Sequence, residues 1–318
     1  MKNLLIGDNS FIGVSHLSQE RARERVEKLD VKSVVEIIET AASSGATGYT
    51  FSTHPLNLKI LSALQDSGKI EQGFGLYPVL PYAQGYVRLA NEKGMKGLVD
   101  ETLSRLSLSD KAKAVFKGGL SALRLDPIGI LKAYVDMELA GYLSEKPVNA
   151  TLRSVLLHEV VTDLCLGLRD VHLLDVFAQH VREKYHVSPG FVTYNLANFV
   201  ALFRKEGLSM KDVVIMTPFN SVGFQMSPSR HSCESCLSAL PESNVIAMSI
   251  MAGGYLKFNE AMDYISSLPN LSGVAVGVSS KEHAHNTFMK LRTITEVSGQ
   301  SAQISEPVKQ PSEDELFE

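Results

Sequence analysis

Cysteine is scarce in this chain, which has three cysteines, Cys165, Cys233 and Cys236, among 318 residues. Three cysteines cannot build the disulfide framework of a small secreted protein. Cys233 and Cys236 have the CxxC spacing of redox and metal sites, but they fall within a helical pattern. Packing as small apolar side chains is therefore the role expected of them.

The chain has no large excess of charge of one sign: it contains 31 basic and 35 acidic residues, and its net charge is −4. No strong electrostatic field follows, so nucleic acid is not an expected partner. Long apolar runs are missing as well, since none reaches the roughly 18–20 residues of a membrane span. Met1–Gly7 leads directly into a predicted strand and lacks the apolar core and cleavage site of a signal peptide. We expect a cytoplasmic protein that binds neither nucleic acid nor membranes.

What the chain does contain is a repeated order of strand and helix, clearest in its C-terminal half. Four apolar runs there each end in small or polar residues and are followed by a helical pattern: Gly190–Asn195, Asp212–Asn220, Asn244–Ser249 and Gly273–Gly277. Short apolar runs that alternate with amphipathic helices predict βαβ units and a parallel sheet.

The N-terminal half supplies four more strands, and eight βα units predict an α/β fold, a (β/α)8 TIM barrel. The four strands are expected at Asn3–Gly7, Gly48–Thr53, Phe74–Leu80 and Ser154–Leu157. Residues 1–299 are expected to form a single domain. Residues 81–126, between strands three and four, are too long for an ordinary loop and predict a helical insertion, either a lid or a packing element. Residues 300–318 are rich in polar and acidic side chains and predict a disordered tail.

The carboxyl ends of barrel strands line the ligand site, so the polar residues at these ends are the candidate site. The candidates for catalysis are His158, Asp8 and His54, and those for substrate contact are Asn9, His16, Tyr77, Glu159, Asn195 and Asn220. Histidines and carboxylates at one barrel mouth can act as a general acid–base system or hold a divalent metal. For each histidine the alternative is a structural role. Adjacent strand residues face opposite sides, so only one of His158 and Glu159 need face the site.

A second candidate region is the turn Gly277–Lys281, which enters a helix with Ser279 and Ser280. Free amides at a helix N-terminus predict an anion or phosphate site, and the alternative is plain capping by serine. Gly253 and Gly254 nearby permit close approach of the backbone.

Several landmarks, in order along the chain, resemble the aldo-keto reductase superfamily. Val155-Leu-Leu-His158 is similar to that family's strand with a catalytic histidine, and Asn195 falls at its Ser-Asn pair. Ala247–Leu256 and Val274–Glu282 are similar to its last two strands and phosphate turn. The resemblance implies the same barrel and a nicotinamide cofactor, NAD(P)H, bound near Ser249, Gly253, Gly277, Ser279 and Ser280.

The chain departs from that family where the family's chemistry occurs. Of the tetrad Asp, Tyr, Lys and His, only His158 has a counterpart, and Ser52 stands at the aspartate position. Met216 replaces the glutamine that holds the nicotinamide amide, and Met248 replaces the stacking tyrosine. No tyrosine activated by a lysine is present to donate a proton.

Three functions therefore stay open. The first is a small-molecule enzyme for a polar carbonyl, sugar or phosphorylated substrate, working by histidine-centred acid–base or metal-assisted chemistry. The second is an NAD(P)H-dependent oxidoreductase whose proton donor is Tyr77 or Tyr82. The third is a non-catalytic binding or assembly protein. Both enzyme functions require His158 at the barrel mouth. The nicotinamide function needs an open groove beside Ser249 and Ser279, and the binding protein predicts a mouth plugged by apolar side chains.

Overall fold

The computed structural model describes residues 2–13, 30–81, 127–240 and 244–304. Its strands are β1 (Asn3–Gly7), β2 (Gly48–Ser52), β3 (Gly75–Leu80), β4 (Thr151–Leu152), β5 (Ser154–Leu157), β6 (Ser188–Val192), β7 (Val214–Pro218), β8 (Asn244–Met248) and β9 (Leu271–Gly277). All the strand pairs are parallel, in the order β2-β1-β9-β8-β7-β6-β5-β3-β4, and a further β2–β3 pairing closes the barrel. The predicted (β/α)8 barrel is confirmed, with β4 as a short strand beside β3.

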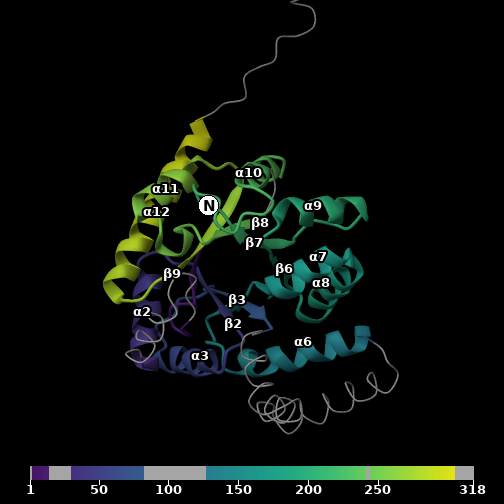
Figure 1. Ribbon diagram of the computed structural model, residues 1–318. Coiled ribbons are helices and arrows are strands. Elements are labelled where there is room, and N and C mark those ends of the chain that lie inside the picture. The colour runs from purple at the N-terminus through teal and green to yellow at the C-terminus, as the bar shows by residue number, and fades with distance from the viewer. Residues whose placement is uncertain (1, 14–29, 82–126, 241–243, 305–318) are drawn as a thin grey trace, which may run out of the picture.

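Helices surround the strands on the outside of the barrel (Figure 1). They are α2 (Val31–Ser43), α3 (Pro55–Ser67), α6 (Pro127–Ser144), α7 (Glu159–Leu168), α8 (Val171–Tyr185), α9 (Leu196–Lys205), α10 (Arg230–Ser238), α11 (Phe258–Ser267) and α12 (Lys281–Ile304), with a 3-10 turn at Ala252–Gly254. In the described part of the chain, no helix is long and apolar enough to cross a bilayer.

The larger apolar core lies between the strands and the surrounding helices. Strand residues that point outward, such as Ile6 and Phe191, pack there against helix residues such as Ile38 and Phe199. Asp30 caps α2 by accepting a hydrogen bond from the Ser33 N–H at 2.7 Å, which fixes where that helix begins. None of the three cysteines is in a disulfide.

A smaller cluster fills the barrel interior with inward side chains from successive strands: Leu5, Tyr77, Leu156, Val192, Val214, Met216 and Ile246. Below them the strands approach closely because glycine replaces larger residues. A Cβ built on Gly273 would lie 2.1 Å from the Asn3 carbonyl oxygen, and one on Gly48 would lie 2.5 Å from the Gly75 carbonyl oxygen. The barrel interior is therefore filled by side chains, and neighbouring strands lie close together toward its amino-terminal end.

Two features of the chain differ from the sequence prediction. Helix α7 was not predicted, and it begins directly after β5 because His158 caps its first turn. Helix α12 continues to Ile304, into the predicted tail. The rest of that tail, residues 305–318, and nearly all of the predicted insertion lie outside the described residues.

Candidate active site

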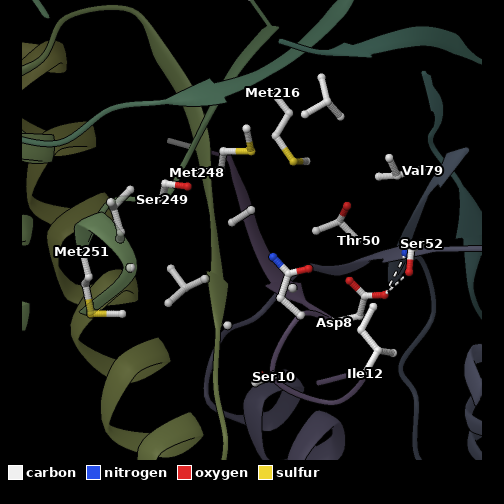
Figure 2. A pocket seen from close by; sticks show the side chains of 18 of the residues that line it. Asp8, Ser10, Ile12, Thr50, Ser52, Val79, Met216, Met248, Ser249 and Met251 are labelled. Carbon is white, nitrogen blue, oxygen red and sulfur yellow. Dashed lines mark hydrogen bonds between the residues drawn. The ribbon is translucent and has the colours of Figure 1, made fainter. Parts of the chain in front are cut away.

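A cavity of about 560 Å³ opens at the carboxyl ends of the barrel strands. That volume falls within the usual range for small-molecule sites. Its lining comes from the segment after β1, the ends of the other strands and the loops after β8 and β9. Figure 2 shows Asp8 and Ser52 on one side of the space, with Met216, Met248 and Ser249 facing it from the other.

Many of the predicted site residues line this cavity: His158, Asp8, Asn9, Glu159, Ser249, Gly253, Gly277 and Ser279. They come from strands far apart in the sequence, and the barrel brings them together because every parallel strand ends at the same rim. His158 and Glu159 both line the cavity, although they are sequence neighbours, because Glu159 already belongs to helix α7.

The remaining predicted residues that the structure describes have other roles. His54 caps α3, where its Nδ1 accepts from the Leu56 N–H at 3.0 Å, and the Ser280 Oγ accepts from the His283 N–H at 3.1 Å. Tyr77 lies inside the barrel, and its hydroxyl donates to the Asn3 Oδ1 at 3.2 Å, at the amino-terminal end.

Asn195 and Asn220 also do not line the cavity. Asn195 precedes α9, and Asn220 is buried and fastens the loop after β7. His16 and Tyr82 lie outside the described residues, so their predicted roles stay predictions.

Asp8 is the most buried of the candidate catalytic groups, with 6% of its surface exposed. Its Oδ2 accepts three hydrogen bonds, from the Ser52 N–H at 2.8 Å, the Ser52 hydroxyl at 2.7 Å and the Asn57 Nδ2 at 2.9 Å. Burial raises the pKa of Asp8 above its ordinary value, although these bonds act in the opposite direction. The carboxyl is therefore a group that retains a proton more readily than an exposed aspartate does.

The relation of Asp8 to Ser52 also bears on the missing tetrad. Ser52 stands where the resembled family has its aspartate, and its main chain and hydroxyl both bind Asp8. A carboxyl group is thus present beside that position, but it comes from the end of β1 instead of β2. Both residues could be identified from the sequence, but their contact could not.

His158 has two neighbours that compete for one ring nitrogen. In one state its Nδ1 accepts a hydrogen bond from the main-chain N–H of Val160, at 3.2 Å. In the other state Nδ1 carries a proton and donates it to the Glu159 Oε2, at 3.1 Å. When Nδ1 accepts, the single proton of the neutral ring is on Nε2. When Nδ1 donates, Nε2 of the neutral ring has a lone pair that can accept a proton. His158 can therefore either donate or accept a proton at Nε2.

Tyr194 continues this chain of polar groups along the cavity wall. Its hydroxyl donates to the Glu159 Oε1 at 3.3 Å. Burial, together with the Glu159 charge, raises the pKa of Tyr194 above its ordinary value, so the phenol stays neutral and remains a donor.

Asp163, which sequence reasoning missed, supports this wall from behind. It lies one turn after Glu159 on α7, and it accepts from the Tyr194 N–H at 3.0 Å and from the Thr193 hydroxyl. Burial raises the pKa of Asp163, and the neighbouring Glu159 charge adds to this effect. The sequence offered no signal for Asp163, because the helix that places it one turn after Glu159 was not predicted.

The loops after β7 and β8 are held in unusual backbone conformations. Ser249 has φ 50° and Gln225 has φ 59°, both in the left-handed region, and the Ser249 hydroxyl donates to the Gln225 Oε1 at 3.4 Å. Asn220 fixes the first loop by exchanging hydrogen bonds with the main chain of Phe224. Such conformations persist only where surrounding contacts enforce them.

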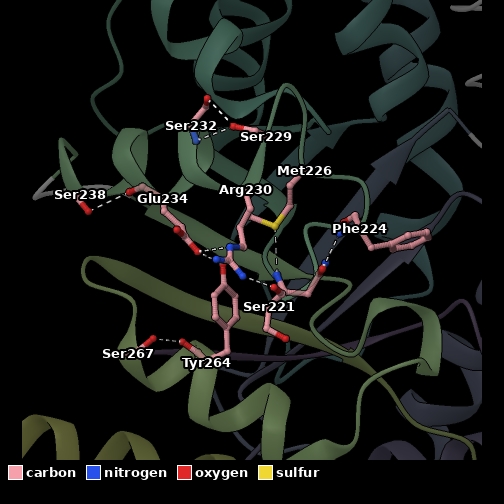
Figure 3. A network of polar contacts seen from close by, with 11 residues as sticks. Ser221, Phe224, Met226, Ser229, Arg230, Ser232, Glu234, Ser238, Tyr264 and Ser267 are labelled. Atoms are coloured by element: carbon pink, nitrogen blue, oxygen red, sulfur yellow. Dashed lines mark hydrogen bonds and ion pairs between the residues drawn. The ribbon is translucent and has the colours of Figure 1, made fainter.

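The far side of the loop after β7 is fastened to α10 and α11. Arg230 donates to the Ser221 carbonyl and pairs with Glu234 at 3.3 Å, and the Tyr264 hydroxyl donates to Glu234 at 2.8 Å (Figure 3). The cavity wall at Ser249 is thus part of a fixed framework.

A metal was one of the expectations for this mouth. Among the residues that the structure describes, no three His, Cys, Asp or Glu side chains are grouped so as to hold a metal ion. His54, one of the expected ligands, is directed to the cap of α3.

The nicotinamide cofactor implied by the resemblance can be tested against the lining. Ser249, Gly277 and Ser279 do border the cavity where the resemblance places the cofactor. The end that would hold the carboxamide, however, presents the apolar side chains of Met216 and Met248. The described lining also contains no lysine or arginine to balance the phosphates, and its basic side chain on α12 is His283. These residues do not fit a nicotinamide dinucleotide.

No protein-family model and no curated protein matches the sequence. Solved structures do match its fold, including two from Pseudomonas aeruginosa that are named as putative aldo-keto reductases. One has a TM-score of 0.57 at 10% identity, and the other has a TM-score of 0.57 at 12% identity. Each alignment covers 92% of this chain and 90% of the other. Likeness at this level of identity establishes the fold: the chain is an aldo-keto-reductase-like (β/α)8 barrel.

Proposed function

We propose that this chain is a small-molecule enzyme that catalyses proton transfer on a carbonyl substrate held at the barrel mouth. The observation that carries the proposal is that a buried carboxyl, Asp8, and a histidine–carboxylate pair, His158 and Glu159, line the same cavity. Groups of this kind are the usual agents of general acid–base catalysis.

The two groups have complementary roles. We assign Asp8 as the acid that donates to the carbonyl oxygen of the substrate, because it lines the cavity and burial raises its pKa above that of an exposed aspartate. His158 removes a proton from the carbon next to that carbonyl when its Nδ1 donates to Glu159 and its Nε2 is free. The carboxylate of Glu159 stabilises the imidazolium that forms. One proton leaves carbon and one arrives on oxygen, giving an enol. Where the deprotonated carbon carries a hydroxyl, that hydroxyl then gives its proton to Asp8 while His158 returns a proton to the former carbonyl carbon, and the carbonyl has moved by one carbon.

Exchange of carbon-bound hydrogen with solvent tests this proposal without knowledge of the natural substrate. The purified protein in D2O would be mixed with 1,3-dihydroxyacetone or with 4-phenyl-2-butanone, and the signal of the protons next to the carbonyl followed by proton NMR. We expect loss of that signal faster than in buffer alone, and no such loss with His158→Asn. If the wild-type protein exchanges no carbonyl probe faster than buffer, the proposal fails.

An NAD(P)H-dependent oxidoreductase is the second candidate. It is favoured by the barrel it shares with aldo-keto reductases and by the wall of Ser249, Gly277 and Ser279. The proton donors suggested by sequence do not support it, because the Tyr77 hydroxyl lies at the other end of the barrel and Tyr82 is outside the described residues.

The third candidate, a non-catalytic binding protein, predicted a mouth plugged by apolar side chains. The cavity instead has an open volume of about 560 Å³ in the described part of the chain and contains titratable groups. This favours an enzyme.

A further inference from the structure

The wall of the cavity opposite Asp8 is made largely of methionine. Met216, Met248 and Met251, named the methionine wall below, all line the space (Figure 2). Met216 lies deepest, on β7, with 4% of its surface exposed. Met248 is further along the barrel axis, because the β7–β8 register pairs Met216 with Ile246 and Pro218 with Met248. Met251 follows in the loop after β8, so the wall extends from the barrel interior toward the rim.

Further apolar side chains lie near this wall, beside the polar Ser249. Ile250 and Leu256 continue it on the β8 side, and Ile12 and Val79 line the cavity from other elements. Methionine side chains are flexible and polarisable, and they make favourable contacts with aromatic rings and with irregular aliphatic groups. The apolar part of a ligand could therefore pack against these methionines, because it needs no hydrogen-bond partner.

The carboxyl groups and the histidine assigned to proton transfer, Asp8, Glu159 and His158, come from other elements of the lining. Asp8 and Glu159 are carboxyls, and no lysine or arginine belongs to the described lining. A carboxylate or phosphate on the ligand would meet His158 and His283 as the basic side chains of the described lining. A ligand without a negative charge suits this lining better than an anion does, because no lysine or arginine faces it.

We propose that the natural substrate is an uncharged carbonyl compound with an aromatic or branched aliphatic body, which the methionine wall holds while Asp8 and His158 face the carbonyl. The proposal rests on the acid–base function above for the placement of the carbonyl, and it adds the chemical class of the rest of the molecule. It also separates this site from one built to hold the carboxamide of a nicotinamide.

Binding of two carbonyl probes tests the proposal. Calorimetric titration would compare 4-phenyl-2-butanone, which has an apolar body, with 1,3-dihydroxyacetone, which has none. We expect the phenyl ketone to bind about tenfold more tightly or better, because burying its ring removes apolar surface from water. Equal affinity of the two probes would overturn the proposal.

Variants of the wall make the test specific. Met248 and Met251 are only partly buried, so replacing them need not disturb the core. Met248→Gln and Met251→Gln should each weaken the phenyl ketone about tenfold, because an amide would be buried against an apolar ring. Met248→Leu should keep the affinity within about twofold, since it conserves volume and polarity. Met289→Gln is the matched control, because Met289 lies on α12 with 42% of its surface exposed and outside the cavity lining.

Melting temperatures establish that each variant is folded. If both glutamine variants of the wall are folded and still bind the phenyl ketone as the wild type does, the wall does not hold the ligand and the proposal is wrong. The two proposals fail separately. A protein that prefers the phenyl ketone but exchanges no carbon-bound hydrogen retains the ligand class and loses the acid–base function. A protein that exchanges dihydroxyacetone without preferring the phenyl ketone shows the reverse.

Discussion

Asp8 and Ser52 are joined by two hydrogen bonds, in which the main-chain N–H and the hydroxyl of Ser52 donate to one oxygen of the Asp8 carboxyl at 2.8 and 2.7 Å. The contact links the end of β1 to the end of β2 at the barrel mouth. It holds a titratable group at the cavity wall in an environment that favours its neutral form.

Replacing Asp8 by asparagine should remove the acid while keeping the contact. The amide oxygen of asparagine can accept the same hydrogen bonds, so we expect the free energy of unfolding near pH 4 to change by less than about 1 kcal/mol. Hydrogen exchange of the carbonyl probes should fall by about 10²-fold or more, the usual contribution of a general acid or base. The matched variant Asp8→Ala leaves the donors of Ser52 and Asn57 unpaired in a buried place, and it should be clearly less stable. Undiminished exchange in a folded Asp8→Asn protein would remove Asp8 from the mechanism.

The same group makes stability depend on pH in a defined direction. The pKa of Asp8 is raised on folding, so the folded state binds more protons than the unfolded state at pH values above the ordinary value of 3.8. Its contribution to the free energy of unfolding is then full below pH 3.8 and is lost as pH rises through the folded-state pKa. Denaturant titrations of the wild type and of Asp8→Asn should therefore diverge as pH rises, with the wild type losing stability relative to the variant. If the difference in free energy of unfolding between the two proteins does not change with pH, the pKa of Asp8 is not raised on folding.

His158 and His54 form a matched pair, because each caps a helix by accepting from the N–H two residues later, and only His158 lines the cavity. Asparagine is a good N-cap residue, so both His158→Asn and His54→Asn should keep most of the stability of the wild type. We expect His158→Asn to abolish hydrogen exchange of the carbonyl probes and His54→Asn to leave it nearly unchanged. Equal losses of activity in the two variants would assign His158 a structural role like that of His54.

The strands could be predicted closely because each buried parallel strand is a short apolar run that turn residues interrupt. The predicted bounds Asn3–Gly7 and Ser154–Leu157 are those observed. Helix α7 was missed because its start depends on the side chain of His158 acting as a cap, and a histidine is not a usual sequence signal for that role.

The candidate site could be predicted only in part. Whether a residue reaches the site depends on the direction in which its side chain points and on how close it lies to the end of its strand. Asp8 and His158 come directly after strands and therefore reach the rim. Tyr77 points inward too, but it lies three residues before the end of β3 and therefore at a lower level of the barrel. Met216 and Met248 were noted as replacements in the cofactor pocket, yet an apolar side chain at a strand end cannot be told from a core residue without the structure.

The close approach of strands at the amino-terminal end predicts a strong effect of a single methyl group. Gly273→Ala would place a Cβ 2.1 Å from the Asn3 carbonyl oxygen, so β1 and β9 would have to move apart. We expect a loss of about 1–3 kcal/mol in the free energy of unfolding, measured by denaturant titration. Gly167→Ala in α7 is the control, because its Cβ would meet no atom within 4 Å and alanine favours a helix by about 1 kcal/mol over glycine. A Gly273→Ala protein as stable as the wild type would contradict the close packing of these two strands.

Titration with NADPH, followed by the fluorescence of the cofactor, decides between the two enzyme functions. We expect no saturable binding up to about 1 mM, the weak end of ordinary cofactor and substrate affinities, because Met216 and Met248 offer no partner to the carboxamide and the described lining has no lysine or arginine for the phosphates. Met216→Gln together with Met248→Tyr would restore the family's side chains at both positions, and melting temperature would show whether the double variant folds. Binding that appears only in this folded variant would show that the two methionines exclude the cofactor. Saturable micromolar binding by the wild type would instead favour the oxidoreductase, and reduction of aldehydes and ketones would then be the activity to measure, with Asp8 as the candidate proton donor.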